Sequence, residues 1–374
     1  MNVPRYEYSR SKIKDRIEYL KKLSAPYGLV IRYAVKANPY SEIIQMIREA
    51  DVHFDASSGY EAAELLKQGV EGSKISLSSQ QLPDNLAELL DAGVLFVATS
   101  LNQLKTFIEI KTHPPAVGVR INPAIGSGHT NRTTTGGINA SFGIWHEYVP
   151  EILELARSYG VAIDRLHIHI GSGADPAVWG KVMDTSLLIT EKMENVASLD
   201  IGGGFKIHRY GDEEETDMEK VLAVFGEKLG SFYKRTGREL CLEIEPGTFF
   251  IAHAGVLVAH VDDIVDTGKN GHTFLRLNTG MNDFLRGTLY GAQHLIEVVN
   301  ASNELREYVV VGHNCESGDI LTPVHGKPEK IERRLLNRAE IGDEVRIYDT
   351  GAYCASMRAK GYNSFPDATE VMVE

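Results

Sequence analysis

The stretch Ile31-Arg-Tyr-Ala-Val-Lys36-Ala-Asn-Pro39 decides how the rest of the chain is interpreted. The apolar run from Leu29 to Val35 predicts a buried strand, and Asn38-Pro39 predicts its end. Lys36 therefore lies at the C-terminal end of a buried strand, where an ammonium group is costly unless it pairs or reacts. Desolvation lowers the pKa of an amine and allows it to form a Schiff base. The alternative is a side chain that simply extends to solvent.

The composition is that of an ordinary globular protein, with 374 residues, 43% of them hydrophobic and 24% charged. A formal net charge of −12 argues against nucleic acid or an anionic membrane as the main partner. Cys241, Cys315 and Cys354 form no CxxC pair and suit a reducing compartment. We find no signal-peptide pattern and no apolar run that could span a bilayer. We therefore expect a cytoplasmic protein with a small-molecule substrate.

Strand and helix patterns alternate along residues 26–250. Strands are predicted at 29–35, 52–55, 74–77, 95–99, 116–122, 166–170, 198–201 and 240–245. A charged helix is predicted before this region, at 10–23. Amphipathic helices are predicted within it at 42–49, 60–67, 83–91, 101–110, 148–158, 182–193 and 217–235. Eight strands with helices between them predict a parallel sheet, and eight is the number that closes a (β/α)₈ TIM barrel.

Beyond Phe250 the pattern changes to alternating stretches with few helices. Strand-like stretches occur at 255–261, 273–277, 307–311 and 343–348. They predict a C-terminal, mostly antiparallel β domain, a sandwich or a small barrel. The expected division is an N-terminal segment, 1–25, that could pack on the β domain, a barrel at 26–250 and the β domain at 251–374. The fold class is α/β.

The strand ends of the predicted barrel carry a set of reactive side chains. Chemistry in such barrels takes place at the C-terminal ends of the strands. The residues there are Lys36, Asp55, Ser78, Ser100, Arg120, His169, Gly202-Gly203-Gly204 and Glu245. A lysine forms a Schiff base, a glycine turn offers N–H groups to a phosphate, and a carboxylate keeps a pyridine nitrogen protonated. Together they meet the needs of pyridoxal 5'-phosphate.

Each of these features also has a plainer explanation. The three glycines alone indicate a tight turn, and Glu245 could form an ion pair with Arg120. His167 and His169 alternate on the predicted strand, so they point the same way. One could stack on a cofactor ring, although strand histidines are commonly core residues. Ser172 could add a hydroxyl donor to the phosphate.

The motifs taken together resemble a known family, the pyridoxal-phosphate decarboxylases with an alanine-racemase-type barrel (fold type III), and within it the diaminopimelate decarboxylases. They run in family order across nearly the whole chain. The motifs are Tyr33-Ala-Val-Lys-Ala-Asn, Phe54-Asp-Ala-Ser-Ser, Arg120-Ile-Asn-Pro, Thr135-Gly-Gly, Phe142-Gly-Ile-Trp, His167-Ile-His-Ile-Gly-Ser-Gly, Gly202-Gly-Gly, Glu245-Pro-Gly, Leu285-Arg, Leu289-Tyr-Gly, Cys315-Glu-Ser-Gly-Asp, Gly351-Ala-Tyr and Tyr362-Asn-Ser.

The resemblance implies a role for each site residue. Lys36 would hold the cofactor covalently, His169 would stack on its ring, and Glu245 would contact its nitrogen. The phosphate would be bound by Ser172, the turn Gly202, Gly203 and Gly204, the backbone of Gly247 and Thr248, and the Tyr353 hydroxyl. Asp55 and Arg120 complete the cofactor-binding set. Arg286, Tyr290, Glu316 and Tyr353 would bind substrate, and no metal is expected.

The resemblance also implies a homodimer with shared active sites, in which Cys315 and Glu316 reach into the barrel of the neighbouring subunit. The substrate would lose CO₂ from Cα, and Cys315 would then protonate that carbon. Glu245 argues against a racemase, because an arginine faces the ring nitrogen in the racemases that this fold resembles.

Three positions depart from the family pattern. Thr248 stands where an arginine usually grips the distal carboxylate of the substrate, and Phe365 replaces a second arginine. Ser141 replaces a lysine, which would remove an ion pair between subunits. The first hypothesis remains decarboxylation of meso-diaminopimelate to L-lysine. The alternatives are a decarboxylase of a different amino acid or conjugate, and a non-catalytic cofactor-binding relative. A CO₂-release assay separates the first two, and covalent cofactor binding tests the third.

Overall fold

We describe a computed structural model of the chain, in which residues 3–110, 113–126 and 135–374 are described. The chain folds as two compact units. Unit 1 comprises residues 1–15, 207–214 and 251–374, and unit 2 comprises residues 16–206 and 215–250. The segment 207–214 groups with unit 1, although the sequence alone places it within the barrel range. We describe each unit by itself.

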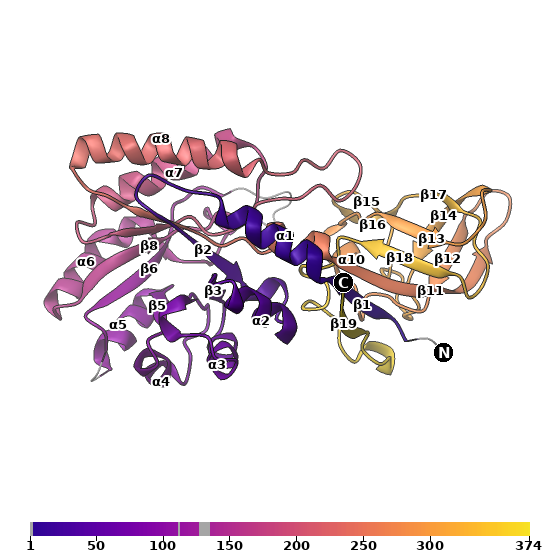
Figure 1. Ribbon diagram of the computed structural model, residues 1–374, viewed down its shortest axis with the longest axis horizontal. Coiled ribbons are helices and arrows are strands. Elements are labelled where there is room, and N and C mark those ends of the chain that lie inside the picture. Colours follow the sequence, from indigo (N-terminus) through magenta and orange to yellow (C-terminus); the bar gives the residue numbers. More distant parts are fainter. Residues whose placement is uncertain (1–2, 111–112, 127–134) are drawn as a thin grey trace. The chain divides into compact units, whose positions relative to one another are not determined.

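Unit 2 is a closed parallel barrel (Figure 1). Among the described residues, its eight strands are β2 (Leu29–Ala34), β3 (His53–Ala56), β4 (Ile75–Leu77), β5 (Leu95–Ala98), β6 (Ala116–Asn122), β8 (Ala162–His167), β9 (Ser198–Asp200) and β10 (Cys241–Ile244). The order β5-β4-β3-β2-β10-β9-β8-β6 is closed by pairing of β5 with β6. The short β7 (Ile144–Trp145) pairs in parallel with the last two residues of β6. The predicted (β/α)₈ barrel is confirmed.

Helices connect the strands and lie outside them (Figure 1). They are α2 (Ser41–Glu49), α3 (Gly59–Lys67), α4 (Leu86–Asp91), α5 (Leu101–Glu109), α6 (Val149–Ser158), α7 (Pro176–Glu191) and α8 (Met218–Thr236). The side chains of Ser58, Ser100 and Asp217 accept backbone N–H groups in the first turns of α3, α5 and α8. Ser100 is therefore a helix cap rather than a site residue. A short helix α9 (Thr248–Ile251) follows β10.

Two elements differ from the sequence prediction. Helix α7 begins at Pro176 rather than at 182, because Asp175 accepts the Ala177 N–H and proline suits the first helical position. Strand β8 occupies Ala162–His167 rather than 166–170. It pairs with β6 and β9 only as far as His167, so His169 lies beyond the strand.

The barrel interior is charged as well as apolar. Glu243 on β10 pairs with Arg32 on β2 at 2.5 Å and with Arg165 on β8 at 3.0 Å. All three side chains are buried or nearly so. Because side chains two residues apart on a strand share a face, Glu243 lies one layer below Glu245, and Arg165 lies one layer below His167. Ions buried this way need each other, because a lone buried charge carries the full desolvation cost.

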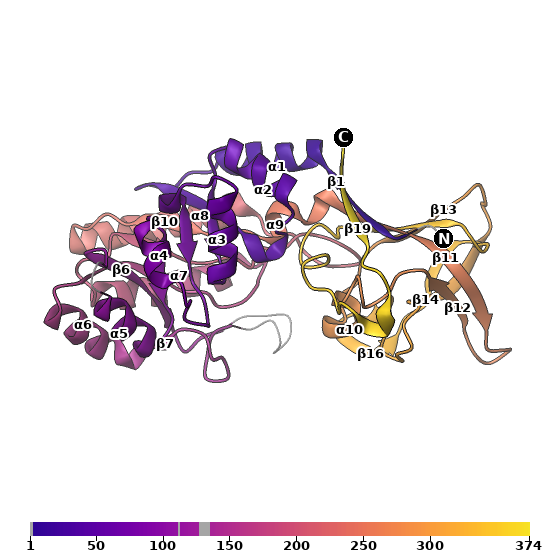
Figure 2. The ribbon, with the colours of Figure 1, turned by 90° about the horizontal axis from the view of Figure 1, so that it is seen from below.

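Unit 1 is built on a mostly antiparallel sheet (Figure 2). Its strands are β1 (Arg5–Ser9), β11 (Gly255–Asp266), β12 (Thr273–Leu277), β13 (Ile296–Val299), β14 (Leu305–Val311), β17 (Arg334–Asn337), β18 (Glu344–Tyr348) and β19 (Thr369–Val373). The main order is β13-β18-β11-β12-β14-β17, and β1 pairs with β11 and β19. The β1–β19 and β12–β14 pairs are parallel. The predicted β domain is confirmed.

The remaining elements of the described residues are short, apart from helix α1 (Arg10–Lys21), within which the boundary between the units falls. Unit 1 also contains the hairpin of β15 (Pro323–Val324) and β16 (Lys327–Ile331), and helix α10 (Arg286–Tyr290). Short 3₁₀ turns occur at Val35–Ala37, Gly72–Lys74, His146–Tyr148, Ala252–Ala254 and Tyr362–Ser364. Across the described residues, no helix is both long and apolar enough to cross a membrane.

Candidate functional site

Lys36 lies where β2 turns into the 3₁₀ turn Val35–Ala37, at the C-terminal end of the barrel strands. Its Nζ donates to Asp55 Oδ2 at 2.7 Å and to Ser57 Oγ at 3.0 Å. Asp55 is 1% exposed, whereas the Lys36 side chain is 39% exposed. The ammonium group is thus anchored to a buried carboxylate and remains reachable from the strand ends. A lysine that merely extends to solvent would lack this anchor.

Glu245, Asp200 and His167 form a buried group at the ends of β10, β9 and β8. One ligand-type atom of each lies within 4.8 Å of the others, and His167 Nε2 is 3.5 Å from Glu245 Oε2. Burial, and then the nearby Asp55 carboxylate, raise the pKa of Glu245 to about 7. Burial raises the pKa of Asp200 well above its ordinary value and lowers that of His167 to about 4. Burial therefore favours the uncharged form of all three groups.

Arg120 on β6 is the other buried cation near this group. Its guanidinium Cζ lies 5.1 Å from the centre of the Phe142 ring. Among the described residues it forms no ion pair with Glu245, although the negative charge of Glu245 acts to raise the pKa of Arg120. Burial dominates and lowers the pKa of Arg120. The geometry therefore does not support the alternative in which Glu245 serves only as the ion-pair partner of Arg120.

The glycine turn after β9 packs directly against its neighbours. A Cβ on Gly203 would lie 2.1 Å from the Glu245 carbonyl oxygen, and one on Gly204 would lie 1.8 Å from that of Gly171. The Gly203 N–H donates to His169 Nδ1 at 3.1 Å, and the Gly202 N–H donates to Asp200 Oδ1 at 2.8 Å. Side chains are thus excluded from the turn by packing. Two of its N–H groups already have partners within the protein.

His169 lies beside this turn as a neutral imidazole. Its Nδ1 accepts a hydrogen bond, which assigns the ring proton to Nε2. Burial, followed by the nearby Arg120, holds the pKa of His169 well below its ordinary value. A neutral ring fixed at one edge is suited to stacking on a flat cofactor.

These barrel residues fit pyridoxal phosphate on three observations. Glu245 Oε1 is buried and has no hydrogen-bond partner among the described residues, so it can accept a ring N–H. Lys36 is an anchored amine that remains accessible. The glycine turn carries no side chains and lies directly beside His169.

The predicted site residues of unit 1 fall into two groups. Cys315 is exposed, and its N–H donates to Asn363 Oδ1 at 2.7 Å. Glu316 Oε2 accepts from the Tyr362 hydroxyl at 3.3 Å, and its Oε1 accepts from the Gly318 N–H at 3.1 Å. These contacts hold the Cys315–Glu316 pair on the turn at 362–364. Buried Asp319 braces the same loop by accepting the Asn314 N–H at 2.9 Å.

The second group of unit 1 contains Arg286, Tyr290 and Tyr353. Arg286 Cζ lies 5.9 Å from the centre of the Tyr290 ring on the same short helix, α10. Tyr353 has a φ of +56°, a left-handed conformation that is uncommon outside glycine. Backbone strain of this kind often accompanies functional positions.

The departures from the family pattern occupy defined places. Thr248 is the first residue of α9, directly after Gly247. Phe365 stacks on His313, with ring centres 3.7 Å apart and planes 8° from parallel. The aromatic pair therefore fills the position beside the Cys315 loop where the family has an arginine. Ser172 lies in the loop after β8, and the loop 126–137 falls largely outside the described residues.

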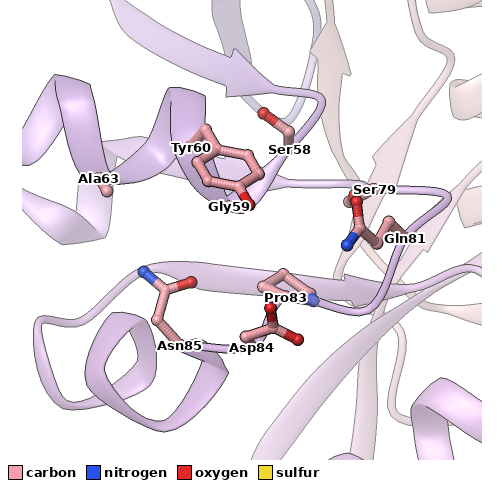
Figure 3. Close-up of a pocket in the computed structure, with 9 residues that line it drawn as sticks. All are labelled: Ser58, Gly59, Tyr60, Ala63, Ser79, Gln81, Pro83, Asp84 and Asn85. Carbon is pink, nitrogen blue, oxygen red and sulfur yellow. The ribbon is translucent and has the colours of Figure 1, made fainter.

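A separate hollow of about 300 Å³ lies between the loops that follow β3 and β4 (Figure 3). Its lining is Ser58, Gly59, Tyr60, Ala63, Ser79, Gln81, Pro83, Asp84 and Asn85. It contains none of the predicted site residues. Tyr60 is 77% exposed at its rim.

The sequence analysis assigned no site role to Ser57 or Asp200, and it considered His167 only as an alternative to His169 for stacking on the cofactor. Ser57 follows Asp55 by two residues, a spacing that places both near one strand end. Asp200 directly precedes the glycine turn, and His167 precedes His169 by two residues. Their position at neighbouring strand ends was a usable signal. Their mutual burial was not visible in the sequence.

Comparison with known proteins agrees with this geometry. The family model for the pyridoxal binding domain of pyridoxal-dependent decarboxylases matches residues 10–252. A diaminopimelate decarboxylase of Streptomyces coelicolor is 33% identical, with 99% of this chain and 84% of that protein covered. A crystal structure of a diaminopimelate decarboxylase superposes with a TM-score of 0.89 at 29% identity, covering 99% of this chain and 88% of the other. That of Helicobacter pylori, complexed with L-lysine, gives 0.86 at 26% identity, covering 100% and 92%.

A closed parallel barrel with an anchored lysine at its strand ends defines a class, the barrel enzymes that work with pyridoxal phosphate. Within that class the chain belongs to the pyridoxal-dependent decarboxylases, in the diaminopimelate decarboxylase family. The resemblance noted in the sequence is confirmed.

Glu245→Gln is expected to remove a pH-dependent loss of stability from the cofactor-free protein. The folded-state pKa of about 7 exceeds the ordinary value of 4.5, so the folded protein binds this proton more tightly than the unfolded chain. The contribution of Glu245 to the stability of the wild type therefore falls as pH rises from 4.5 to 7, by about 3 kcal/mol in total. Glutamine has no such proton. Urea unfolding between pH 4.5 and 8.5 measures the difference between the two proteins.

The control for this comparison is Glu239→Gln, which neutralises an exposed carboxylate of the same unit. Its difference from wild type should stay flat over the same range. An equally flat difference for Glu245→Gln would show that burial does not perturb Glu245.

Proposed function

We propose that the chain is a pyridoxal-phosphate-dependent decarboxylase that converts meso-diaminopimelate to L-lysine and CO₂. One observation carries this proposal. The same end of the barrel holds Lys36, which is anchored and accessible, and Glu245, a buried carboxylate whose Oε1 has no hydrogen-bond partner among the described residues. Membership of the decarboxylase family supports the reaction type. The curated relatives that bear the name diaminopimelate decarboxylase support the substrate.

In this proposal residues at the barrel strand ends would hold the cofactor. Lys36 would bind it covalently, Glu245 would accept the ring N–H, and His169 would stack on the ring. The phosphate would be bound by the glycine turn, Ser172 and the backbone of Gly247 and Thr248, with the Tyr353 hydroxyl of the β domain as a further donor. When bound, the cofactor supplies an electron sink for the electron pair left at Cα as CO₂ departs.

The protein's own groups prepare and complete the reaction. Asp55 and Ser57 orient the Lys36 amine, and Arg120 offsets the negative charge of the nearby carboxylates. The buried position of Glu245 strengthens its hydrogen bond to a protonated ring nitrogen. In a homodimer with shared sites, Cys315 donates a proton to Cα, and Glu316 binds the substrate. Arg286 and Tyr290 bind the distal end of the substrate.

A CO₂-release screen of purified protein loaded with pyridoxal phosphate tests this function. It should cover meso-diaminopimelate, both enantiomers of lysine, ornithine and arginine, and a glutamate-type acid. We expect turnover of meso-diaminopimelate above all the others, with L-lysine as the product by chromatography. No CO₂ from diaminopimelate at millimolar concentration would refute the substrate assignment.

A second candidate is a decarboxylase of a different amino acid or amino-acid conjugate. It is favoured by Thr248 and by the Phe365–His313 stack, which stand where the family has arginines. One charge-assisted contact is worth roughly 1.5–3 kcal/mol, so each loss weakens dicarboxylate binding by one to two decades. Turnover of another acid in the same screen, with diaminopimelate silent, would establish this candidate.

A further inference from the structure

Unit 1 contains a second arginine near Arg286, and the sequence pattern alone does not indicate a functional role for it. Arg209, in the segment 207–214, has a side chain that is 5% exposed. The next residue, Tyr210, lies under the guanidinium of Arg334, whose Cζ is 3.5 Å from the ring centre. This stacking fixes the segment on unit 1. The positive charges of Arg209 and Arg286 both lower the pKa of the buried Cys354 thiol and that of the His294 ring, so the two arginines lie in the same neighbourhood.

The charge of Arg209 is only partly compensated. Its Nη1 is 3.3 Å from Glu213 Oε1, while its Nε and Nη2 are buried without a partner among the described residues. The pKa of Arg209 falls to about 10 because of burial and then because of the neighbouring Arg286. A buried cation that retains unused N–H groups carries a desolvation cost, which a nearby anion would offset.

The neighbouring carboxylates are already engaged elsewhere. Asp349 accepts from His253 at 2.6 Å, and Glu332 pairs with Arg334 at 3.2 Å. Arg286 has no ion-pair partner among the described residues, and its Nε is buried without a hydrogen bond. Among the described residues, Glu213 is the one carboxylate within ion-pair distance of either guanidinium, and it pairs with Arg209, while the charge of Asp349 acts on Arg209 from farther away. Nε and Nη2 of Arg209 and Nε of Arg286 therefore remain without a hydrogen-bond partner among these residues.

We propose that Arg209 and Arg286 together form the site that binds the distal carboxylate of the substrate. Arg286, which is half-buried, would contact the carboxylate. Arg209 is a positioning residue, whose buried and weakly screened charge strengthens that contact. The inference rests on the proposed function and deepens it, because Arg209 supplies a cation that compensates for Thr248 and Phe365.

The natural probes are L-lysine and 1,5-diaminopentane. The two compounds have the same carbon chain between two amines, but only lysine has the carboxylate. 1,5-Diaminopentane is called the diamine below. Binding to the cofactor-loaded protein can be measured by calorimetry without any turnover. In wild type, lysine should bind more tightly than the diamine.

Arg209→Gln should weaken lysine binding roughly tenfold, leave diamine binding unchanged, and raise KM for diaminopimelate with kcat within about threefold. Arg209→Lys should recover much of the loss, because it keeps the charge. Glu213→Gln should act in the opposite direction and tighten lysine binding roughly two- to fivefold, because it removes the one close counter-charge. The control is Arg306→Gln, an exposed arginine of the same unit that should have no effect.

The outcomes separate the inference from the proposed function. Equal losses for lysine and the diamine in Arg209→Gln would show a purely structural role and overturn the inference. A loss of pyridoxal phosphate affinity with unchanged lysine binding would assign Arg209 to the phosphate instead, and would also overturn it. If Arg209→Gln does not fold, Glu213→Gln decides by the sign of its effect. Carboxylate-selective binding that depends on Arg209, without diaminopimelate turnover, would uphold the inference and refute the proposed function.

Discussion

Lys36→Ala is expected to lower kcat/KM for diaminopimelate on the order of 10³-fold or more, because residues that act as one catalytic unit fail together when one is removed. The variant loses both the amine that binds the cofactor covalently and the partner of Asp55, which then remains a buried carboxylate without its cation. Borohydride reduction followed by peptide mass analysis should find the cofactor on Lys36 in wild type and nowhere in the variant.

The matched control for Lys36→Ala is Lys67→Ala, an exposed lysine at the end of α3. It should retain wild-type activity and the cofactor label on Lys36. Should Lys36→Ala keep its activity to within tenfold, or should the label in wild type appear on another lysine, the assignment of Lys36 would be wrong.

Cys315→Ala is expected to lower kcat by on the order of 10²–10⁴-fold, the range for removal of a general acid. The thiol is exposed and its backbone is held by Asn363, so alanine removes the proton donor with little effect on folding. Steady-state kinetics with diaminopimelate measure the loss. Cys241→Ala, at the opposite end of the barrel strands, is the control and should leave kcat unchanged.

Mixing the two inactive variants provides a sharper test. If each site takes Lys36 from one copy and Cys315 from the other, a mixed dimer of Lys36→Ala and Cys315→Ala contains one complete site. Random exchange would then restore about a quarter of wild-type activity, since half of the dimers are mixed and each has one working site of two. Absence of recovery after confirmed exchange would contradict shared sites.

The sequence was sufficient for the architecture because hydrophobic periodicity reports directly on burial. The alternation of strands and helices predicted the barrel, and the position of Lys36 at a strand end predicted the reactive face. Strand β1 was missed, although Tyr6 and Tyr8 are fully buried and alternate with Arg5 and Glu7. The alternation was present but short, and charged residues on the outer face masked it.

The electrostatics of the site were less accessible from the sequence. The coupling of Glu245 with Asp200 and His167 depends on the register of three strands that are distant in the chain. The partly compensated charge of Arg209 and its unused N–H groups depend on which carboxylates lie near it in the fold. Neither follows from local residue patterns, because both are properties of packing among remote segments.

The pairing of β1 with β11 and β19 has a consequence for how the protein is made. Residues 5–9 leave the ribosome well before their sheet partners, residues 255–266 and 369–373. The strands of the barrel, which lie between residues 29 and 244, are synthesised while the first strand is still unpaired. Chains fold as their domains emerge, and long-range pairs form slowly. Nascent chains therefore carry an unpaired tyrosine-containing strand until β11 has been synthesised, and one edge of this strand stays unpaired until β19 follows.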